Sequence, residues 1–235
     1  MSVNELVINY PKVIVFKFND FVSNVGPTLA SKIQPVSTTV SISDTLLNPN
    51  SDSMSIVPCT ISEVVDTINK LQYYKGTGLD GFLTSVVKSV SNHIAKQLTH
   101  IFNLSFTSGV FPGKLKLTNV TPIFKSNAKL TVNNYRPISL LPVFSKVLEK
   151  LMHKRLMSFF VDKCNLLTEY YYGCREKHST YMTLSNIIDQ ISESLDVKKY
   201  SIGIFLDLSK AFDTIDHRIL LPKLQICGLA HIHEV

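Results

Sequence analysis

The sequence has little cysteine, and the spacing of the four that are present excludes two common kinds of stabilising site. Cys59, Cys164, Cys174 and Cys227 form no CxxC pair, so neither a zinc site nor a disulfide framework is predicted. We therefore expect an intracellular protein, in the nucleus or the cytoplasm, where thiols stay reduced. The sequence also lacks an apolar run of about 18 residues, which a membrane helix requires, and its N-terminus lacks the pattern of a secretory signal. No membrane partner is expected.

Several common catalytic motifs are also missing. The sequence contains no GxxxxGKS/T loop, no HExxH and no GxSxG, so the corresponding hydrolase classes have no support. The pattern GxGxxG does occur, within KGTGLDG at 75–81. A dinucleotide site requires a strand before these glycines, whereas a helical pattern precedes them here. The segment is therefore interpreted as a connection between two helices.

The basic charge of the chain is concentrated in one segment. The 235 residues carry 24 Lys/Arg against 18 Asp/Glu, a net charge of +6. Residues 113–155 contain nine Lys/Arg and one acid, Glu149, hence +8. Such a segment is expected where one surface contacts nucleic-acid phosphates, or where the polar face of a helix is solvated. Both interpretations stay open at this point.

Hydrophobic periodicity predicts a mixture of helices and strands. Thr60, with Glu63 at the spacing of a capping box, is expected to begin a helix. Apolar residues at helical intervals predict helices at about 60–71, 82–108, 143–161 and 180–195. Short apolar runs predict strands at 13–18, 119–124 and 201–207, and two prolines predict an extended segment at 133–142. Residues 34–56 are rich in Ser, Thr, Asn and Pro and are predicted to form a loop.

The run SIGIFLD at 201–207 is the sharpest local signal of chemistry. It is predicted to be a buried strand that ends in the carboxylate of Asp207. A charge in an apolar setting is costly unless it is paired or binds a cation, and Mg²⁺ takes oxygen ligands of this kind. The alternative is that Asp207 caps the following turn. Asp216 is expected to cap a helix, which Pro222 would interrupt unless it lies in the first turn.

Several blocks of the sequence resemble the reverse transcriptases of non-LTR (LINE-type, jockey-like) retrotransposons. The two signature blocks are NNYRPISLLPVFSKVLEKLMHKRL at 133–156 and FLDLSKAFDTIDHRIL at 205–220. Four further blocks follow the family's order: FVSNVGPTLASKI at 21–33, KGTGLDGF at 75–82, LTHIFNLSFTSGVFPGKLKLTNVTPIFK at 98–125 and YGCREKHST at 172–180. The resemblance covers nearly the whole chain from about residue 20.

This resemblance implies a polymerase site built from two regions. Asp207 would be the catalytic aspartate that binds metal, and the main-chain carbonyl of Leu208 a further metal ligand, with Mg²⁺ as cofactor. Lys125 and Arg136 would grip the incoming triphosphate, since Arg suits bidentate phosphate contact and Lys acts as a point charge. Phe212 would pack under the sugar and exclude a ribose 2′-OH. The expected partners are an RNA template, a DNA primer and a dNTP.

The resemblance also implies an α/β (α+β) fold with the helix-rich fingers and partial palm of a right-hand polymerase. The expected domains are an irregular N-terminal segment at 1–56, a helical extension at 57–118, fingers at 119–200 and the start of the palm at 201–235. The Ala-Asp-Asp turn and the thumb would follow, so the isolated chain is expected to be inactive as a polymerase. Two alternatives are a non-catalytic nucleic-acid-binding remnant and a partly folded, truncated product.

Overall fold

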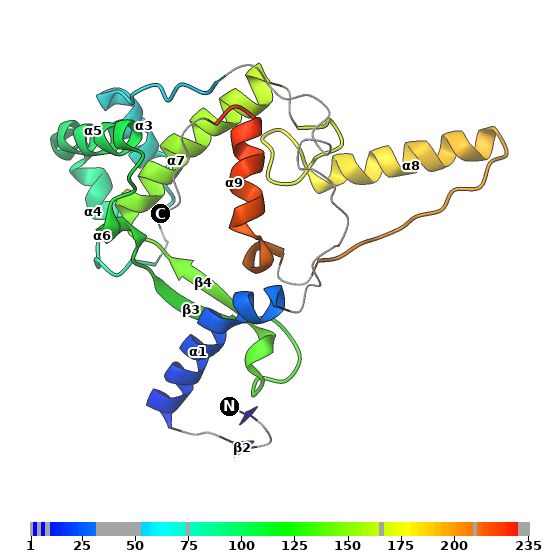
Figure 1. The fold of residues 1–235 in the computed structure, drawn as a ribbon, viewed down its shortest axis with the longest axis horizontal. Coiled ribbons are helices and arrows are strands. Elements are labelled where there is room, and N and C mark those ends of the chain that lie inside the picture. Colours follow the sequence, from blue (N-terminus) through cyan, green and yellow to red (C-terminus); the bar gives the residue numbers. More distant parts are fainter. Residues whose placement is uncertain are drawn as a thin grey trace. The chain divides into compact units, whose positions relative to one another are not determined.

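The chain divides into two compact units, and each is described by itself (Figure 1). The structure is a computed structural model that describes residues 2–3, 6–7, 10–31, 53–73, 76–164, 167–208 and 211–229. The first unit contains residues 1–156 and 212–235, and the second contains residues 157–211. The predicted domain boundaries differ from these limits and stay a prediction.

The hydrophobic core of the first unit lies between helices α3 (Ile61–Asn69), α4 (Thr84–Ser89), α5 (Ser91–Ser108) and α7 (Val143–Met157). Its largest fully buried side chains include Ile68 of α3, Phe102 of α5 and Leu148 of α7. Burying a side chain of this size contributes roughly 2–3 kcal/mol. The apolar positions that predicted these helices are therefore the positions that hold them together.

Local signals explain where these helices begin and end. The Thr60 hydroxyl accepts a hydrogen bond of 3.2 Å from the Glu63 backbone N–H, which confirms the predicted cap of α3. Helix α5 ends at Gly109, whose φ of 69° is left-handed and favours glycine. The predicted helix at 82–108 is divided at Val90, so that α4 and α5 are separate helices.

A two-stranded antiparallel hairpin precedes α7, and its second strand leads directly into that helix. Strands β3 (Asn119–Phe124) and β4 (Tyr135–Leu140) pair with Asn119 opposite Leu140 and Phe124 opposite Tyr135. A short helix, α6 (Gly113–Lys116), precedes β3, and a 3-10 turn at Val132–Asn134 precedes β4. The predicted strand and the predicted extended segment are therefore confirmed, as the two arms of one hairpin.

The N-terminal region contains a helix where a strand was predicted. Helix α1 (Pro11–Ala30) covers residues 13–18, so the strand prediction is wrong. Pro11 occupies the first turn, where its missing N–H costs nothing. The half-buried residues Ile14, Phe18, Val25 and Leu29 recur at helical spacing. This longer period outweighs the β-branched run at 13–15, because strand preference depends strongly on tertiary partners.

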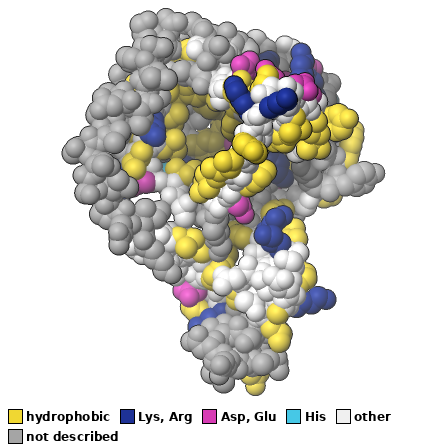
Figure 2. All heavy atoms as spheres, turned by 90° about the vertical axis from the view of Figure 1, so that its right-hand side faces the viewer, with side chains coloured by type: hydrophobic (Ala, Val, Ile, Leu, Met, Phe, Trp, Pro, Cys, Tyr) yellow, Lys and Arg dark blue, Asp and Glu magenta, His cyan; other side chains and the backbone are white. Residues whose placement is uncertain are grey.

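The second unit contains helix α8 (Thr180–Asp196), as predicted from its periodicity. The Ser179 side chain caps α8 by accepting a hydrogen bond from the Met182 N–H. No residue of α8 is buried. Figure 2 views the molecule from the right-hand side of Figure 1, where α8 is drawn, and shows hydrophobic side chains (yellow) at the surface.

The expectation of a buried strand at 201–207 is wrong. Residues 201–208 form no helix or strand, and Phe205 is 87% exposed. A strand needs hydrogen-bonded neighbours to be stable, and the described residues offer none to this segment. The apolar run indicates that this segment can be buried, but the described part of the chain forms no sheet that would bury it.

The remaining described elements are short. Helix α9 (His217–Ile226) begins at Asp216, whose carboxylate accepts a hydrogen bond of 2.9 Å from the Arg218 N–H, as predicted. Helix α9 runs through Pro222, so the predicted interruption does not occur. The other elements are β1 (Ser2–Val3), β2 (Leu6–Val7), a π-helical turn at Ser158–Lys163 and a 3-10 turn at Ala211–Thr214. None of the helices that the structure describes is long and apolar enough to cross a membrane. The described chain is thus helix-rich with small antiparallel sheets.

Candidate functional site

The hairpin brings the two predicted phosphate-binding cations onto one face. Arg136 pairs directly with Ile123 across the two strands. The Lys125 N–H donates a 2.8 Å hydrogen bond to the Asn134 carbonyl, which extends the ladder by one residue. Because side chains alternate along a strand, Ile123, Lys125 and Arg136 share one face. Lys125 and Arg136 are then diagonal neighbours, whose Cα atoms lie roughly 7–8 Å apart. We call this the open face of the hairpin.

The open face is exposed to solvent. Lys125 and Arg136 are both exposed, and so are the isoleucines beside them, Ile123 and Ile138. Two cations on an exposed, partly apolar ribbon, neither of them ion-paired with a described residue, can bind a polyphosphate directly.

The opposite face of the hairpin carries an aromatic cluster that anchors it. The rings of Phe124 and Tyr135 meet edge to face with their centres 5.5 Å apart. The ring of Phe18 of α1 meets that of Tyr135 in the same way, with the centres 5.1 Å apart. The Tyr135 hydroxyl donates a hydrogen bond of 2.8 Å to the Lys129 carbonyl, and the Lys129 ammonium lies 5.9 Å from the Phe124 ring centre. Such aromatic pairs contribute about 0.5–1.5 kcal/mol each beyond their buried area. The packing on one face leaves the other available for a ligand.

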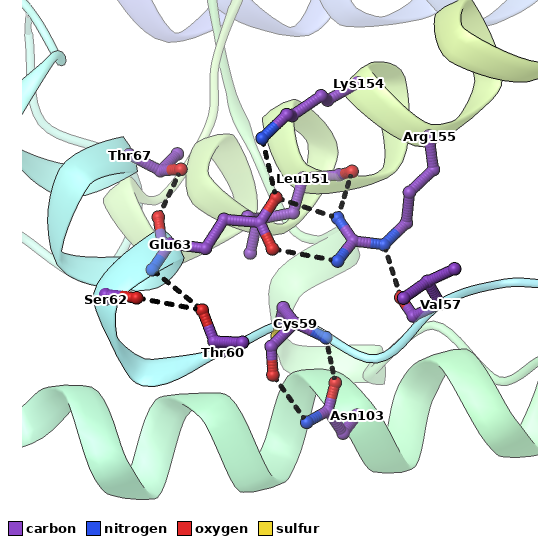
Figure 3. A network of polar contacts seen from close by, with 10 residues as sticks. All are labelled: Val57, Cys59, Thr60, Ser62, Glu63, Thr67, Asn103, Leu151, Lys154 and Arg155. Atoms are coloured by element: carbon purple, nitrogen blue, oxygen red, sulfur yellow. Dashed lines mark hydrogen bonds and ion pairs between the residues drawn. The ribbon is translucent and has the colours of Figure 1, made fainter.

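Two of the nine cations at 113–155 pair with the carboxylate of Glu63 on α3 (Figure 3). The Arg155 guanidinium donates to both carboxylate oxygens of Glu63, at 3.3 and 2.9 Å, and to the Val57 carbonyl at 2.6 Å. Lys154 donates to the same carboxylate at 3.2 Å. The Arg155 side chain is only 10% exposed and lies 5.0 Å from the Phe106 ring centre. Arg155 therefore ties α7 to the start of α3.

A second set of polar contacts lies beside this network. The Asn103 side chain of α5 accepts from the Cys59 N–H at 2.7 Å and donates to the Cys59 carbonyl at 3.0 Å (Figure 3). One amide thus satisfies both backbone groups of a buried residue. The sequence predicts neither the pairing of Arg155 with Glu63 nor the contacts of Asn103 with Cys59. The capping box identified Glu63 only as a local residue, and no sequence pattern connects it to a cation 92 residues away.

The ion pairs change the titration of Glu63. Burial by itself would raise the pKa of its carboxyl, but hydrogen bonds and positive charge from Arg155 and Lys154 outweigh burial, and the pKa is lowered. The ionised carboxylate therefore stabilises the fold above the pKa of an unfolded glutamate. This contribution is lost as the pH falls through the lowered pKa.

The predicted metal ligands lie in the second unit, whereas the hairpin cations lie in the first. Asp207 and Leu208 belong to the exposed segment 201–208, and Leu208 is 75% exposed. Phe212 belongs to the first unit and is 89% exposed. Among the residues that the structure describes, no group of three or more His, Cys, Asp or Glu side chains could hold a metal ion. The hairpin is therefore the part of the predicted site whose geometry is defined.

Comparisons with known proteins support the resemblance. Residues 123–234 match the reverse transcriptase (RNA-dependent DNA polymerase) family. The RNA-directed DNA polymerase from mobile element jockey of Drosophila melanogaster is 31% identical over 183 residues, 77% of this chain and 20% of the relative. The probable RNA-directed DNA polymerase from transposon BS, also of Drosophila melanogaster, is 29% identical over 183 residues, with the same coverage of both chains. The chain spans about a fifth of the length of these relatives.

Proposed function

Because this chain is homologous to the reverse transcriptases of non-LTR retrotransposons, we propose that it supplies the nucleotide-gripping hairpin of an RNA-directed DNA polymerase. The observation that carries this proposal is the hairpin register. It places Lys125 and Arg136 as diagonal neighbours on the open face. Arg136 would bind phosphate oxygens in a bidentate manner, and Lys125 would add a point charge.

Asp207 and Leu208 would hold a divalent cation, Mg²⁺, for the same reaction. Their donor chemistry supports this assignment, because a carboxylate and a main-chain carbonyl are the oxygen ligands that Mg²⁺ accepts. The Asp207 carboxylate is exposed, so no burial has to be reversed for it to bind a cation. When bound, such an ion neutralises charge on the reacting oxygens. Phe212 would close the space beneath the sugar and disfavour a 2′-OH.

The proposal predicts salt-sensitive binding of an RNA template annealed to a DNA primer in the presence of a dNTP and Mg²⁺. Under these conditions we expect the double substitution Lys125→Ala with Arg136→Ala to weaken the affinity of the chain about tenfold and to reduce the slope of log K against log salt by roughly two, because two cation–phosphate contacts are lost. The affinity would be measured by fluorescence anisotropy of the labelled duplex over a range of salt concentrations.

The matched control removes two positive charges from elsewhere in the first unit. Lys70 and Lys96 are exposed on the helical core and lie outside the hairpin. The variant with Lys70→Ala and Lys96→Ala should keep the affinity of the unmodified chain to within a small factor. Equal losses in the two double variants would show that only net charge matters, and would contradict a specific role for the hairpin.

A second candidate is binding of nucleic acid without catalysis. The exposed lysines of α6, the hairpin and α7 favour it, because each could neutralise a phosphate. They are Lys114, Lys116, Lys129 and Lys150. Under this alternative EDTA would leave duplex affinity unchanged and an added dNTP would not alter it. Under the polymerase proposal, dNTP with Mg²⁺ would raise duplex affinity, and Arg136→Ala would remove that gain.

A further inference from the structure

The loop at 76–82 contacts the point where the hairpin joins the core, and the closest approach is made by a glycine. A Cβ atom added at Gly78 would lie 2.5 Å from the Pro142 nitrogen, 2.6 Å from the Pro142 Cα and 2.8 Å from the Leu141 carbonyl carbon. Real Cβ atoms essentially never approach other atoms this closely. The obstacle is backbone, which cannot rotate away as a side chain could. Gly78 therefore serves to bring two backbones together.

The requirement at Gly78 is for space and not for an unusual conformation. The loop's left-handed residue is Gly81, whose φ is 69° and whose N–H donates a 3.2 Å hydrogen bond to the Gly78 carbonyl. A Cβ at Gly81 would meet nothing within 4 Å. One glycine thus shapes the turn, and the other makes the contact with residues 141–142.

Residues 141–142 form the root of the hairpin, between the end of β4 at Leu140 and the start of α7 at Val143. On the α7 side the root is firmly held. Val143 and Ser145 are buried, and the Ser145 hydroxyl donates a 2.6 Å hydrogen bond to the Leu115 carbonyl. The loop adds further contacts on both sides of the root: Phe82 meets Phe144 edge to face at 5.8 Å, and Gly76 lies beside the Leu140 side chain.

A small change at the root has a large effect at Arg136. Arg136 lies five positions before Leu141, which at about 3.3 Å per residue is roughly 16 Å of strand. A rotation of about 10° at the root would therefore displace Arg136 by roughly 3 Å, more than a bidentate phosphate contact tolerates.

We propose that the loop at 76–82 is a positioning element for the hairpin, in which Gly78 sets the direction in which β4 leaves the core and so places Arg136. Gly78 is thus a positioning residue that acts through Arg136 and touches no nucleotide itself. This inference rests on the proposed function where ligand affinity is concerned, but its geometric part does not.

The geometric part is tested with spin labels on the full chain. One label replaces Asn127, in the turn between the hairpin strands, and the other replaces Lys96 on α5. Gly78→Ala should shift the distance between the labels by a few ångströms, on the scale of the displacement estimated above. Gly113→Ala should leave it unchanged, because a Cβ there would meet no atom within 4 Å. An unchanged distance in a folded Gly78→Ala chain would overturn the proposal.

The functional part is tested by a double-mutant cycle on affinity for the RNA–DNA duplex with dNTP and Mg²⁺. Gly78→Ala alone should weaken binding about tenfold, and should add little in a chain that already carries Arg136→Ala. Additive losses would mean that Gly78 is merely structural. If Arg136→Ala alone had no effect, the proposed function would fail, while the label distance would still decide the positioning role. Phe82→Leu, a milder change at the same root, should shift both readouts in the same direction and covers the case in which Gly78→Ala does not fold.

Discussion

Replacing Arg155 with alanine should lower the free energy of unfolding by about 2 kcal/mol, because it leaves the half-buried carboxylate of Glu63 without its main partner. The guanidinium makes hydrogen bonds to Glu63, to the Val57 carbonyl and to the Leu151 carbonyl, and it also packs near the Phe106 ring. Lys154 remains available to Glu63, which keeps the loss below that expected for a fully buried pair. Urea unfolding followed by circular dichroism measures the difference.

Lys154→Ala is the matched control, because it removes a partner of the same carboxylate from a side chain that is 73% exposed. We expect a loss within about 1 kcal/mol, as for other surface ion pairs. Arg155→Lys should fall between the two, since it keeps the charge but not the planar fork. Equal midpoints for Arg155→Ala and Lys154→Ala would contradict a structural role for Arg155 and return it to the set of cations available to a ligand.

Limited digestion with chymotrypsin should cut the exposed segment of the second unit long before the helical core. Tyr200 and Phe205 are almost fully exposed in residues 199–208, which form no helix or strand. Phe102 and Phe106 are buried in α5. Cleavage there requires the core to open, which at ordinary stabilities lowers the rate about a thousandfold or more. Mass spectrometry of early time points identifies the first cuts.

The variant Tyr200→Ser with Phe205→Ser should abolish these two early cuts and leave later ones unchanged. Early cleavage after Phe102 at a rate similar to that after Tyr200 would mean that the core is not stably packed. That result would favour the partly folded alternative. Protection at Tyr200 in the intact chain would instead mean that residues 199–208 are covered.

Local sequence patterns are sufficient to predict most of the helices and both strands of the hairpin. The capping box at Thr60 and Glu63 lies within four residues, and the periods of α7 and α8 extend over several turns. Such signals depend only on neighbouring residues, so they can be recognised without the fold. Local patterns do not predict that Lys125 and Arg136 lie on one face of the hairpin. This placement follows from the pairing of Ile123 with Arg136, which the sequence does not specify.

The features that the sequence did not reveal depend on contacts between distant segments. The pairing of Glu63 with Arg155 and the approach of Gly78 to Pro142 join residues far apart in the chain. The glycines at 76–81 lie in the connection between α3 and α4, as predicted, but nothing in their spacing indicates which backbone they approach. The error at 201–207 has a related cause, because an apolar run indicates that a segment can be buried but not that a partner is present.

These contacts link the packing of the core to the proposed chemistry. Arg155 secures the C-terminal end of α7, while the loop at 76–82 secures the hairpin root before its N-terminal end. Helix α7 is therefore held at both ends. The aromatic cluster of Phe18, Phe124 and Tyr135 supports the hairpin from the opposite side. The basic segment thus contains two cations that pair with Glu63, Lys154 and Arg155, and two ligand-binding candidates on the hairpin, Lys125 and Arg136.

Photocrosslinking of an azido-dATP to the full chain, with Mg²⁺ and a primer–template duplex, tests whether the hairpin grips the nucleotide. Mass spectrometry should locate the crosslink within residues 119–140, and Arg136→Ala should abolish it while Lys96→Ala should not. A crosslink confined to other segments, or one that persists unchanged in Arg136→Ala, would contradict the assignment of the hairpin as the nucleotide grip.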